Sequence, residues 1–309
     1  MSSPVQSVAL FGPTGVGKTA VAIELARLLR ARGEQPVAIS ADALQVYRGL
    51  EILTGVANAA QRAELEHRLV SFLPIDASFS AGQYAQLAHA EIDAALAEGR
   101  RPIVVGGTGL YLRAALTELD LRPPPAEGVR ERLSAELERY GAPALHARLA
   151  ERAPWAAEEI DPGDRQRVVR SLELLEAGEL EAPDGPNQLW TQEMRRPTLL
   201  VGLVMERGAL YRQIDARVEG MLRAGVAEEA RVAHSSGAGE TARKALGFTE
   251  LLSGDIDAMK RRTRNYARRQ LTWMRKLAPP LLIDLSERDP GDAATEIAAA
   301  LHERESRRD

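Results

Sequence analysis

A glycine-rich loop near the N-terminus constrains the possible folds of this chain more than any other feature. Residues 11–20 read FGPTGVGKTA and match G-x-x-x-x-G-K-[ST], the pattern of a phosphate-binding loop, or P-loop. A short apolar run from Val8 leads into the loop, and residues 19–32 follow it with apolar side chains at helical spacing. A strand before the loop and a helix after it make the match specific. We therefore expect an α/β fold with a parallel sheet.

The alternation of short apolar runs and helical patterns continues beyond the loop. It predicts further strands at 35–42, 101–109 and 198–205, with an amphipathic helix at 80–100. The final third is mostly helical in pattern and includes predicted helices at 208–233 and 260–276.

The pattern changes at LRPPPAEG, residues 121–128, because consecutive prolines continue neither a helix nor a central strand. From there to about residue 195 the sequence is helical in character and ends in a turn-rich piece, 181–188. The predicted fold class is therefore α/β: a P-loop NTPase-like parallel sheet core flanked by helices, with an inserted all-helical domain. The predicted core is 1–122 with 198–309, and the predicted helical insertion is 123–197.

The loop predicts a bound diphosphate or triphosphate. Its backbone N–H groups form an anion nest at the start of a helix, Lys18 adds a positive charge, and the Thr19 hydroxyl is a candidate Mg²⁺ ligand. A chance match in a glycine-rich turn is the alternative, and the flanking strand and helix outweigh it. The usual companion is a carboxylate at the end of a second buried strand. That strand here carries Gly106 and Gly107, which argues against an ordinary ATPase or GTPase and leaves small-molecule kinases possible.

The best candidate for a functional acid is Asp42, at the end of the second predicted strand. Ligands of open parallel sheets bind at this edge, where a carboxylate could act as a general base or hold a metal ion. The alternative is a helix N-cap. Gln45 could face the same pocket. For Thr108 at the next strand end, a capping role and a site role are equally favoured.

A basic stretch near the C-terminus predicts a polyanionic partner. Residues 260–276 contain no acid, and as a helix their basic side chains would cover one broad face. A solvated surface helix usually mixes charge signs, so contact with nucleic acid or several phosphates is favoured over a solvated face. The basic residues are Lys260, Arg261, Arg262, Arg264, Arg268, Arg269, Arg275 and Lys276. Considered by itself, a second cluster is more typical of a solvated helix. It consists of Arg165, Gln166, Arg167 and Arg170.

Composition excludes several classes of function. The absence of cysteine excludes disulfides, thiol nucleophiles and cysteine-ligated zinc, and the five histidines show no metal-binding spacing. The net charge of −4 hides any basic patch. No signal peptide and no apolar run of about 18 residues is present, so a cytoplasmic protein without a membrane partner is expected. No obligate protein partner is evident.

Six stretches of the chain together resemble the tRNA dimethylallyltransferase family, also called tRNA isopentenyltransferases. They occur in the family's order from Gly12 to Arg275: GPTGVGKT, ISADALQVYRG, VVGGTGLYL, DRQRVVRSLE, LYRQIDARVEGMLRAG and TRNYARRQLTWMR. The resemblance implies transfer of a dimethylallyl group from dimethylallyl diphosphate to N6 of adenosine 37, beside the anticodon of tRNA. Inorganic diphosphate would leave, and the insertion would grip the anticodon stem-loop.

The resemblance also implies roles for individual residues. Asp42 would take the proton of the amine, Lys18 and Thr19 would act on the leaving group with Mg²⁺ as the cofactor, and Arg217 would lie near the diphosphate. The implied diphosphate site is Gly12, Pro13, Thr14, Gly15, Val16, Gly17, Lys18 and Thr19. The implied tRNA contacts are Asp42, Ala43, Leu44, Gln45, Thr108, Gln166, Arg167, Val168, Val169 and Arg170.

The chain departs from the family pattern at three places. Ala43 follows the aspartate where the family commonly has serine, ILTGVAN at 52–58 replaces IGTAKP, and Thr249 replaces a lysine. Two alternatives to the transferase stay open from the residues alone. One is a P-loop kinase acting on a small molecule with ATP, and the other is a non-catalytic RNA-binding or nucleotide-switch protein.

Overall fold

The computed structural model describes residues 5–119, 121–122, 125–182 and 193–306. The chain divides into two compact units: unit 1 comprises 1–119 with 192–309, and unit 2 comprises 120–191. The predicted insertion, 123–197, starts three residues later and ends six residues later than unit 2. Pro123 and Pro124 and most of the turn-rich piece at 181–188 lie outside the described residues.

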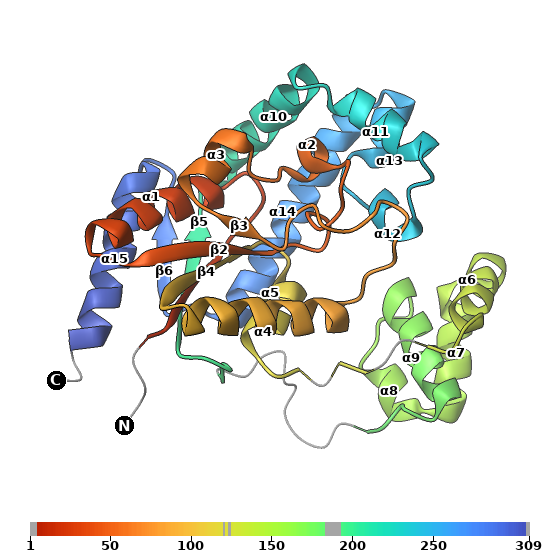
Figure 1. Ribbon diagram of the computed structural model, residues 1–309. Helices are drawn as coiled ribbons and strands as arrows, with labels where there is room; N and C mark the ends of the chain where they lie inside the picture. Colours follow the sequence, from red (N-terminus) through yellow and green to blue (C-terminus); the bar gives the residue numbers. More distant parts are fainter. Residues whose placement is uncertain (1–4, 120, 123–124, 183–192, 307–309) are drawn as a thin grey trace. The chain divides into compact units, whose positions relative to one another are not determined.

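Unit 1 is built on a six-stranded parallel sheet (Figure 1). The strands are β1 Ser7–Phe11, β2 Gln35–Ala41, β3 His67–Arg68, β4 Arg100–Gly106, β5 Thr198–Val204 and β6 Leu281–Asp284. Their order across the sheet is β3-β2-β4-β1-β5-β6. The predicted α/β fold with a parallel sheet is confirmed. The pattern missed β3 and β6, because two- and four-residue edge strands carry too few side chains to show a period.

Helices surround this sheet. In unit 1 they are α1 Lys18–Ala31, α2 Glu51–Thr54, α3 Ala59–Glu64, α4 Ala81–Ala97, α5 Gly109–Leu116, α10 Arg207–Arg223, α11 Val226–Ser235, α12 Glu240–Arg243, α13 Phe248–Ser253, α14 Ile256–Leu277 and α15 Pro290–Ser306. Helices α1 and α15 pack together on one face of the sheet, and α4 and α5 pack together on the other (Figure 1). Strand β1 is buried at all five residues, as expected for a strand covered on both faces.

The helical stretch predicted over 208–233 consists of two helices in the structure. Helix α10 ends at Arg223, and Gly225 has φ 92°, a left-handed conformation that interrupts the helix before α11. A second apolar core is formed by helices α10, α11, α13 and α14 together with the segment after β2. This core includes Tyr47, Val218, Phe248 and Met259.

Unit 2 consists of helices over its described residues, 121–122 and 125–182: α6 Val129–Tyr140, α7 Ala142–Arg152, α8 Pro154–Glu158 and α9 Arg165–Ala177. Its own apolar core includes Leu133, Leu149, Val168 and Leu172. The Glu173 side chain is fully buried beside this core and pairs with Arg130 and Arg170. Among the described residues, no helix is long and apolar enough to cross a membrane.

The order of the strands creates a crevice at the carboxyl edge of the sheet. Strands β1 and β4 are neighbours, but the chain leaves β1 toward β2 on one side and leaves β4 toward β5 on the other. Such a reversal separates the loops that follow the two strands, and ligands of open α/β sheets bind there. The P-loop follows β1, Gly107 follows β4, and Asp42 follows β2 one place further along the sheet.

Candidate phosphate-binding and catalytic site

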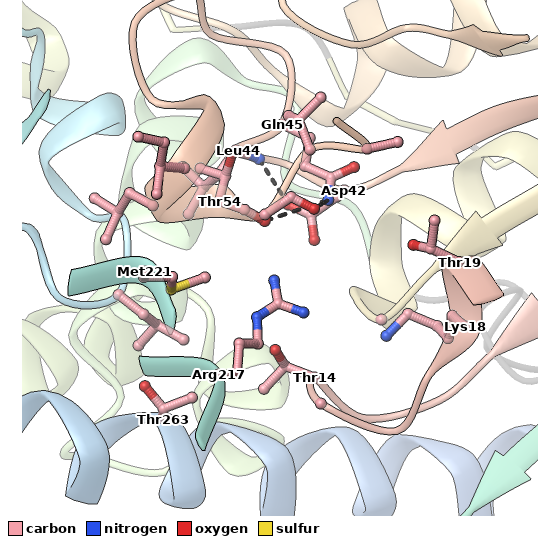
Figure 2. A pocket seen from close by; sticks show the side chains of 18 of the residues that line it. Thr14, Lys18, Thr19, Asp42, Leu44, Gln45, Thr54, Arg217, Met221 and Thr263 are labelled. Atoms are coloured by element: carbon pink, nitrogen blue, oxygen red, sulfur yellow. Dashed lines mark hydrogen bonds between the residues drawn. The ribbon is translucent and has the colours of Figure 1, made fainter. Parts of the chain in front are cut away.

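A cavity of about 830 Å³ lies at this carboxyl edge, within unit 1. Its wall combines the P-loop, the segment after β2, α2, and side chains of α10 and α14. Figure 2 shows Asp42, Arg217 and Lys18 reaching into the same space from three different elements. The fold therefore assembles one site from residues that are far apart in the sequence: Lys18 and Arg217, for example, are 199 positions apart.

The P-loop presents its glycine-rich turn to the cavity. Gly15 and Gly17 have φ 84° and 101°, which residues with a Cβ rarely adopt. Gly17 is also the N-cap of α1, and it leaves the first amides of the helix without a capping side chain. Of the eight residues assigned to the diphosphate, those that line the cavity are Thr14, Gly15, Gly17, Lys18 and Thr19. Gly12, Pro13 and Val16 lie buried behind them.

Two cations face the cavity in an environment that disfavours their charge. Burial, followed by the positive charge of the nearby Arg217, lowers the pKa of Lys18 to about 7, and the negative charge of Asp42 acts in the opposite direction. The Lys18 ammonium donates to the carbonyl oxygens of Gly12 at 2.9 Å and Pro13 at 3.0 Å. Burial also lowers the pKa of Arg217, while Asp42 raises it. A bound anion would favour the charged form of both side chains.

Arg217 lies directly against the segment that departs from the family pattern. A Cβ at Gly55 would come within 1.8 Å of the Arg217 guanidinium. Arg217 makes no hydrogen bond or ion pair with any residue that the structure describes. Its donors are therefore available to an anion in the cavity, as the resemblance implied.

The two glycines at the end of β4 leave no room for a carboxylate. A Cβ on Gly106 would lie 2.3 Å from the Ala41 carbonyl oxygen, and one on Gly107 would lie 2.3 Å from Nε2 of Gln270. The same Gly107 Cβ would approach Lys18 Nζ to 3.3 Å. The absence of an acid at this strand end, noted in the sequence, therefore has a steric cause.

Asp42 begins a turn rather than a helix. One oxygen of its carboxylate, Oδ1, accepts a hydrogen bond from the Leu44 N–H at 2.9 Å, and residues 42–50 contain no helix. The alternative of a helix N-cap is therefore wrong, although the turn uses the same type of bond. Figure 2 shows the carboxylate directed into the cavity. Its second oxygen can accept a proton there.

The neighbours of Asp42 hold this turn in place. The Ser40 hydroxyl donates to Gln45 Oε1 at 2.8 Å, and Gln45 Nε2 donates to the carbonyl oxygens of Thr54 at 3.3 Å and Gly55 at 3.2 Å. Gln45 thus lines the cavity with an amide that already bonds within the protein. Leu44 also lines the cavity, whereas Ala43 does not.

Thr108 lies at the start of α5 but makes no capping hydrogen bond with its side chain. Its hydroxyl instead lies 3.1 Å from the hydroxyl of Tyr266 on α14. Burial, followed by the negative charge of Asp42, raises the pKa of Tyr266 to about 12. Tyr266 therefore stays neutral near pH 7 and can donate a hydrogen bond. Tyr266 lines the cavity, and Thr108 stands behind it.

The charges of α14 have counter-charges that the sequence pattern did not show. Lys260 pairs with Glu219 at 2.9 Å, Arg264 with Asp215 at 2.8 Å, and Arg262 with Glu250. These acids belong to α10 and α13, so a search for acids within 260–276 could not find them. The inference that no acid balances the stretch is wrong for these three residues and for Arg261, which pairs with Asp255 at 3.9 Å. Arg268, Arg269 and Arg275 are exposed and pair with no acid among the described residues.

The predicted tRNA contacts of unit 2 fall on two sides of α9. Gln166 and Arg167 are exposed near its first turn, whereas Val168 and Val169 are buried in the core of unit 2. Arg170 is held by Glu173 at 3.0 Å and by the Arg122 carbonyl oxygen at 2.8 Å. Direct contacts from this helix would therefore come from its exposed side chains.

Two residues that the sequence interpretation passed over have clear positions in the site. Gln270 on α14 bonds to both the P-loop and Gly107. Glu229 on α11 accepts from the Ile52 and Leu53 N–H groups at 2.8 Å each, and so holds the first turn of α2. The available signal for Gln270 was its place on the apolar stripe of a basic helix, three residues after Ala267 and four before Met274.

Comparison with known proteins agrees with the family resemblance. Residues 45–277 match the family model described as IPP transferase. Curated proteins named tRNA dimethylallyltransferase are similar over most of the chain. The protein from Kineococcus radiotolerans is 40% identical over 285 residues, 88% of each chain. The protein from Rhodospirillum centenum is 42% identical over 278 residues, 85% of this chain and 86% of the relative.

Solved structures are also similar to this chain over most of its length. The tRNA isopentenylpyrophosphate transferase from Bacillus halodurans aligns with a TM-score of 0.69 and 32% identity, over 97% of this chain and 98% of that one. A eukaryotic dimethylallyltransferase described as acting on tRNA aligns with a TM-score of 0.74 over 95% of this chain and 77% of its own. At 23% identity, that second match speaks for the fold alone.

Proposed function

The chain belongs to the IPP transferase family, and from this premise we propose how its own residues carry out the reaction. It is an enzyme that transfers a dimethylallyl group to tRNA. The relatives and the match to a tRNA isopentenylpyrophosphate transferase structure support this activity and not the kinase alternative. The proposed donor is dimethylallyl diphosphate, and the proposed acceptor atom is N6 of adenosine 37, beside the anticodon.

One observation carries the assignment of roles: a carboxylate and a cationic anion nest face each other across one cavity. In the proposed reaction the N6 amine attacks C1 of the isoprenoid, the C1–O bond breaks, and its electron pair leaves with the diphosphate. Asp42 accepts the proton that the amine loses. A kinase would use the same loop for a phosphoryl donor, but it would leave the exposed arginines of α14 without a role.

The positive groups of the cavity surround the proposed position of the leaving diphosphate. The amides of the P-loop, the start of α1, Lys18 and Arg217 would all stabilise negative charge growing on the diphosphate. Because burial disfavours both cations before the ligand arrives, their interaction with the diphosphate gains in strength. Positioning of the weakly nucleophilic amine supplies the rest.

The cavity suits two reactants. Its volume of about 830 Å³ lies toward the upper end of the range for ligand pockets, roughly 300–1,000 Å³. The lining residues Leu44, Val218 and Met221 belong to one apolar cluster and would hold the isoprenoid chain. A stacked adenine cannot expose N6 to such a cavity, so the base would be turned out of the anticodon loop.

Mg²⁺ is the proposed cofactor, and the donor set fits it. Among the described residues there is no cluster of three acidic or histidine side chains that could hold a metal ion. Mg²⁺ is commonly held by few protein ligands together with substrate phosphates and water. The Thr19 hydroxyl lines the cavity beside Lys18 and would be its protein ligand. The ion would supply charge neutralisation at the diphosphate.

The deciding experiment supplies unmodified tRNA, Mg²⁺ and dimethylallyl diphosphate to the purified protein. We expect mass spectrometry of the digested tRNA to show one C5 addition on an anticodon-loop adenosine. A parallel reaction with ATP and no RNA tests the kinase alternative. No adduct together with turnover of ATP would refute the proposed function.

A further inference from the structure

Gln270 is the polar side chain that joins α14 to the phosphate-binding loop. It lies in the middle of the basic helix, yet only 4% of its surface is exposed. Its position is on the buried stripe of the helix, between Ala267 and Met274. A glutamine placed in a core must have hydrogen-bond partners, because an unpaired buried amide is costly.

Both ends of the Gln270 amide bond to the two loops that border the crevice. Oε1 accepts from the Thr14 N–H of the P-loop at 2.8 Å, and Nε2 donates to the Gly107 carbonyl oxygen after β4 at 2.8 Å. The fit is close, since a Cβ on Gly107 would lie 2.3 Å from Nε2. One side chain therefore fixes the ends of β1 and β4 relative to each other.

The Gln270 bonds continue into the cavity. Gln270 also forms a hydrogen bond with Tyr266, which slightly opposes the rise in the pKa of Tyr266 that burial causes, and the Tyr266 hydroxyl lies beside that of Thr108. Thr14, bonded through its backbone, is followed by Gly15 and Gly17, which form the wall that receives the phosphate. The orientation of those amides depends on where the chain at Thr14 is held.

We propose that Gln270 is a positioning residue that sets the P-loop amides for the diphosphate. This inference rests on the proposed function, because it takes the P-loop to be the diphosphate site. Gln270 lines the cavity, but both ends of its amide already bond to Thr14 and Gly107, and it would act through these two loops. Without its amide, one N–H and one carbonyl at the crevice lose their partners, and the loop can relax away from the arrangement that binds phosphate.

Two variants test the two halves of this role. Gln270→Met keeps the length of the side chain and removes both hydrogen bonds. Gln270→Glu keeps an acceptor for Thr14 and loses the donor to Gly107. As a matched control, Met274→Ala removes a buried side chain from the same stripe one turn further on, away from the P-loop. All proteins are compared below their unfolding temperatures, and binding of inorganic diphosphate is measured by calorimetry.

We expect both Gln270 variants to bind inorganic diphosphate about ten- to hundredfold more weakly than the parent chain. The KM for dimethylallyl diphosphate should rise, while the Kd for tRNA stays within about twofold. Met274→Ala should lose thermal stability and keep its diphosphate affinity. A purely structural role for Gln270 would make the Gln270 variants behave like Met274→Ala, and that result would overturn the inference.

The experiment also separates the inference from the proposed function. If the parent chain binds inorganic diphosphate but transfers no C5 unit to tRNA, the proposed function fails, and a loss of diphosphate binding in Gln270→Met still supports the positioning role. If the parent chain performs the transfer and Gln270→Met binds diphosphate equally well, the positioning role fails alone.

Discussion

At the scale of single residues, Asp42 illustrates how one carboxylate can serve both the backbone and the chemistry. One oxygen closes a turn with the Leu44 N–H, and the carboxylate is aimed at the cavity shared with Lys18 and Arg217. Substitutions at this position can therefore change structure and chemistry together. A useful variant must keep the turn and remove only the base.

Asp42→Asn meets this condition, because the amide oxygen can still accept from the Leu44 N–H. We expect kcat for dimethylallyl transfer to fall by about 10²–10⁴, the usual contribution of a general base. Asp42→Ala should lose transfer as well, with tRNA binding largely kept. The measurements are single-turnover transfer, tRNA affinity and thermal unfolding of each variant. Full activity of Asp42→Asn would show that the carboxylate is not the base.

The lowered pKa of Lys18 predicts how diphosphate binding depends on pH. Its pKa is lowered to about 7, first by burial, so above pH 7 the free protein holds it mostly neutral, and a bound diphosphate would restore its proton. Binding therefore takes up a proton above pH 7, and affinity should fall about tenfold per pH unit between roughly pH 7.5 and 9. The last ionisation of a terminal phosphate, near about 6, lies below this window.

The measurement is calorimetry with dimethylallyl diphosphate at pH 8 in two buffers that differ in ionisation enthalpy. The parent chain should take up close to one proton per ligand bound. Lys18→Met should bind weakly with almost no uptake. Zero uptake by the parent chain would mean that Lys18 is already charged before binding.

At the scale of elements, α14 combines three tasks on three faces. Its buried stripe packs on the core and holds the P-loop through Gln270. Lys260, Arg262 and Arg264 pair with acids of neighbouring helices. The exposed, acid-free arginines, which include Arg268 and Arg275, are the ones we propose for tRNA phosphates.

Each of these exposed arginines should contribute separately to the salt dependence of tRNA binding. We expect Arg268→Ala and Arg275→Ala each to weaken binding and to reduce the slope of log K against log salt concentration by about one. Arg30→Ala is the matched control, since it removes one exposed charge at the far end of α1 from the P-loop. Filter-binding titrations at several salt concentrations measure the slopes. Equal slopes for all four proteins would exclude α14 from the tRNA interface.

At the scale of the whole molecule, the candidate site and the second basic cluster lie in two units with separate cores. Every residue that lines the cavity belongs to unit 1, and the second basic cluster belongs to unit 2. This separation predicts that diphosphate binding and tRNA binding respond to different substitutions.

Arg167→Glu tests the division, because Arg167 is exposed near the start of α9. Reversal of its charge should weaken tRNA binding by about tenfold and leave diphosphate binding unchanged. Arg152→Glu, at the end of α7 in the same unit, makes the same change of charge as a control. An equal loss in both variants would indicate general repulsion of tRNA and not a contact at α9.

Much of this protein could be predicted from its sequence, because the deciding features are local or periodic. The P-loop, the strands at β1, β2, β4 and β5, and the placement of Asp42 at a strand end follow from patterns within about 15 residues. The six stretches that carry the family resemblance also lie in the sequence and predicted the family correctly.

The tertiary structure decided what depends on residues far apart in the chain. The partners of the α14 charges lie on α10 and α13, and Gln270 lies 256 residues from the loop that it bonds. Neither relation produces a periodic pattern in the sequence, because the packing of the elements determines which side chains become neighbours. The depressed pKa of Lys18 has the same origin, since its burial depends on the elements assembled around the P-loop. The sequence by itself thus determined which groups the site contains, and packing determined which of them are charged, paired and held in place.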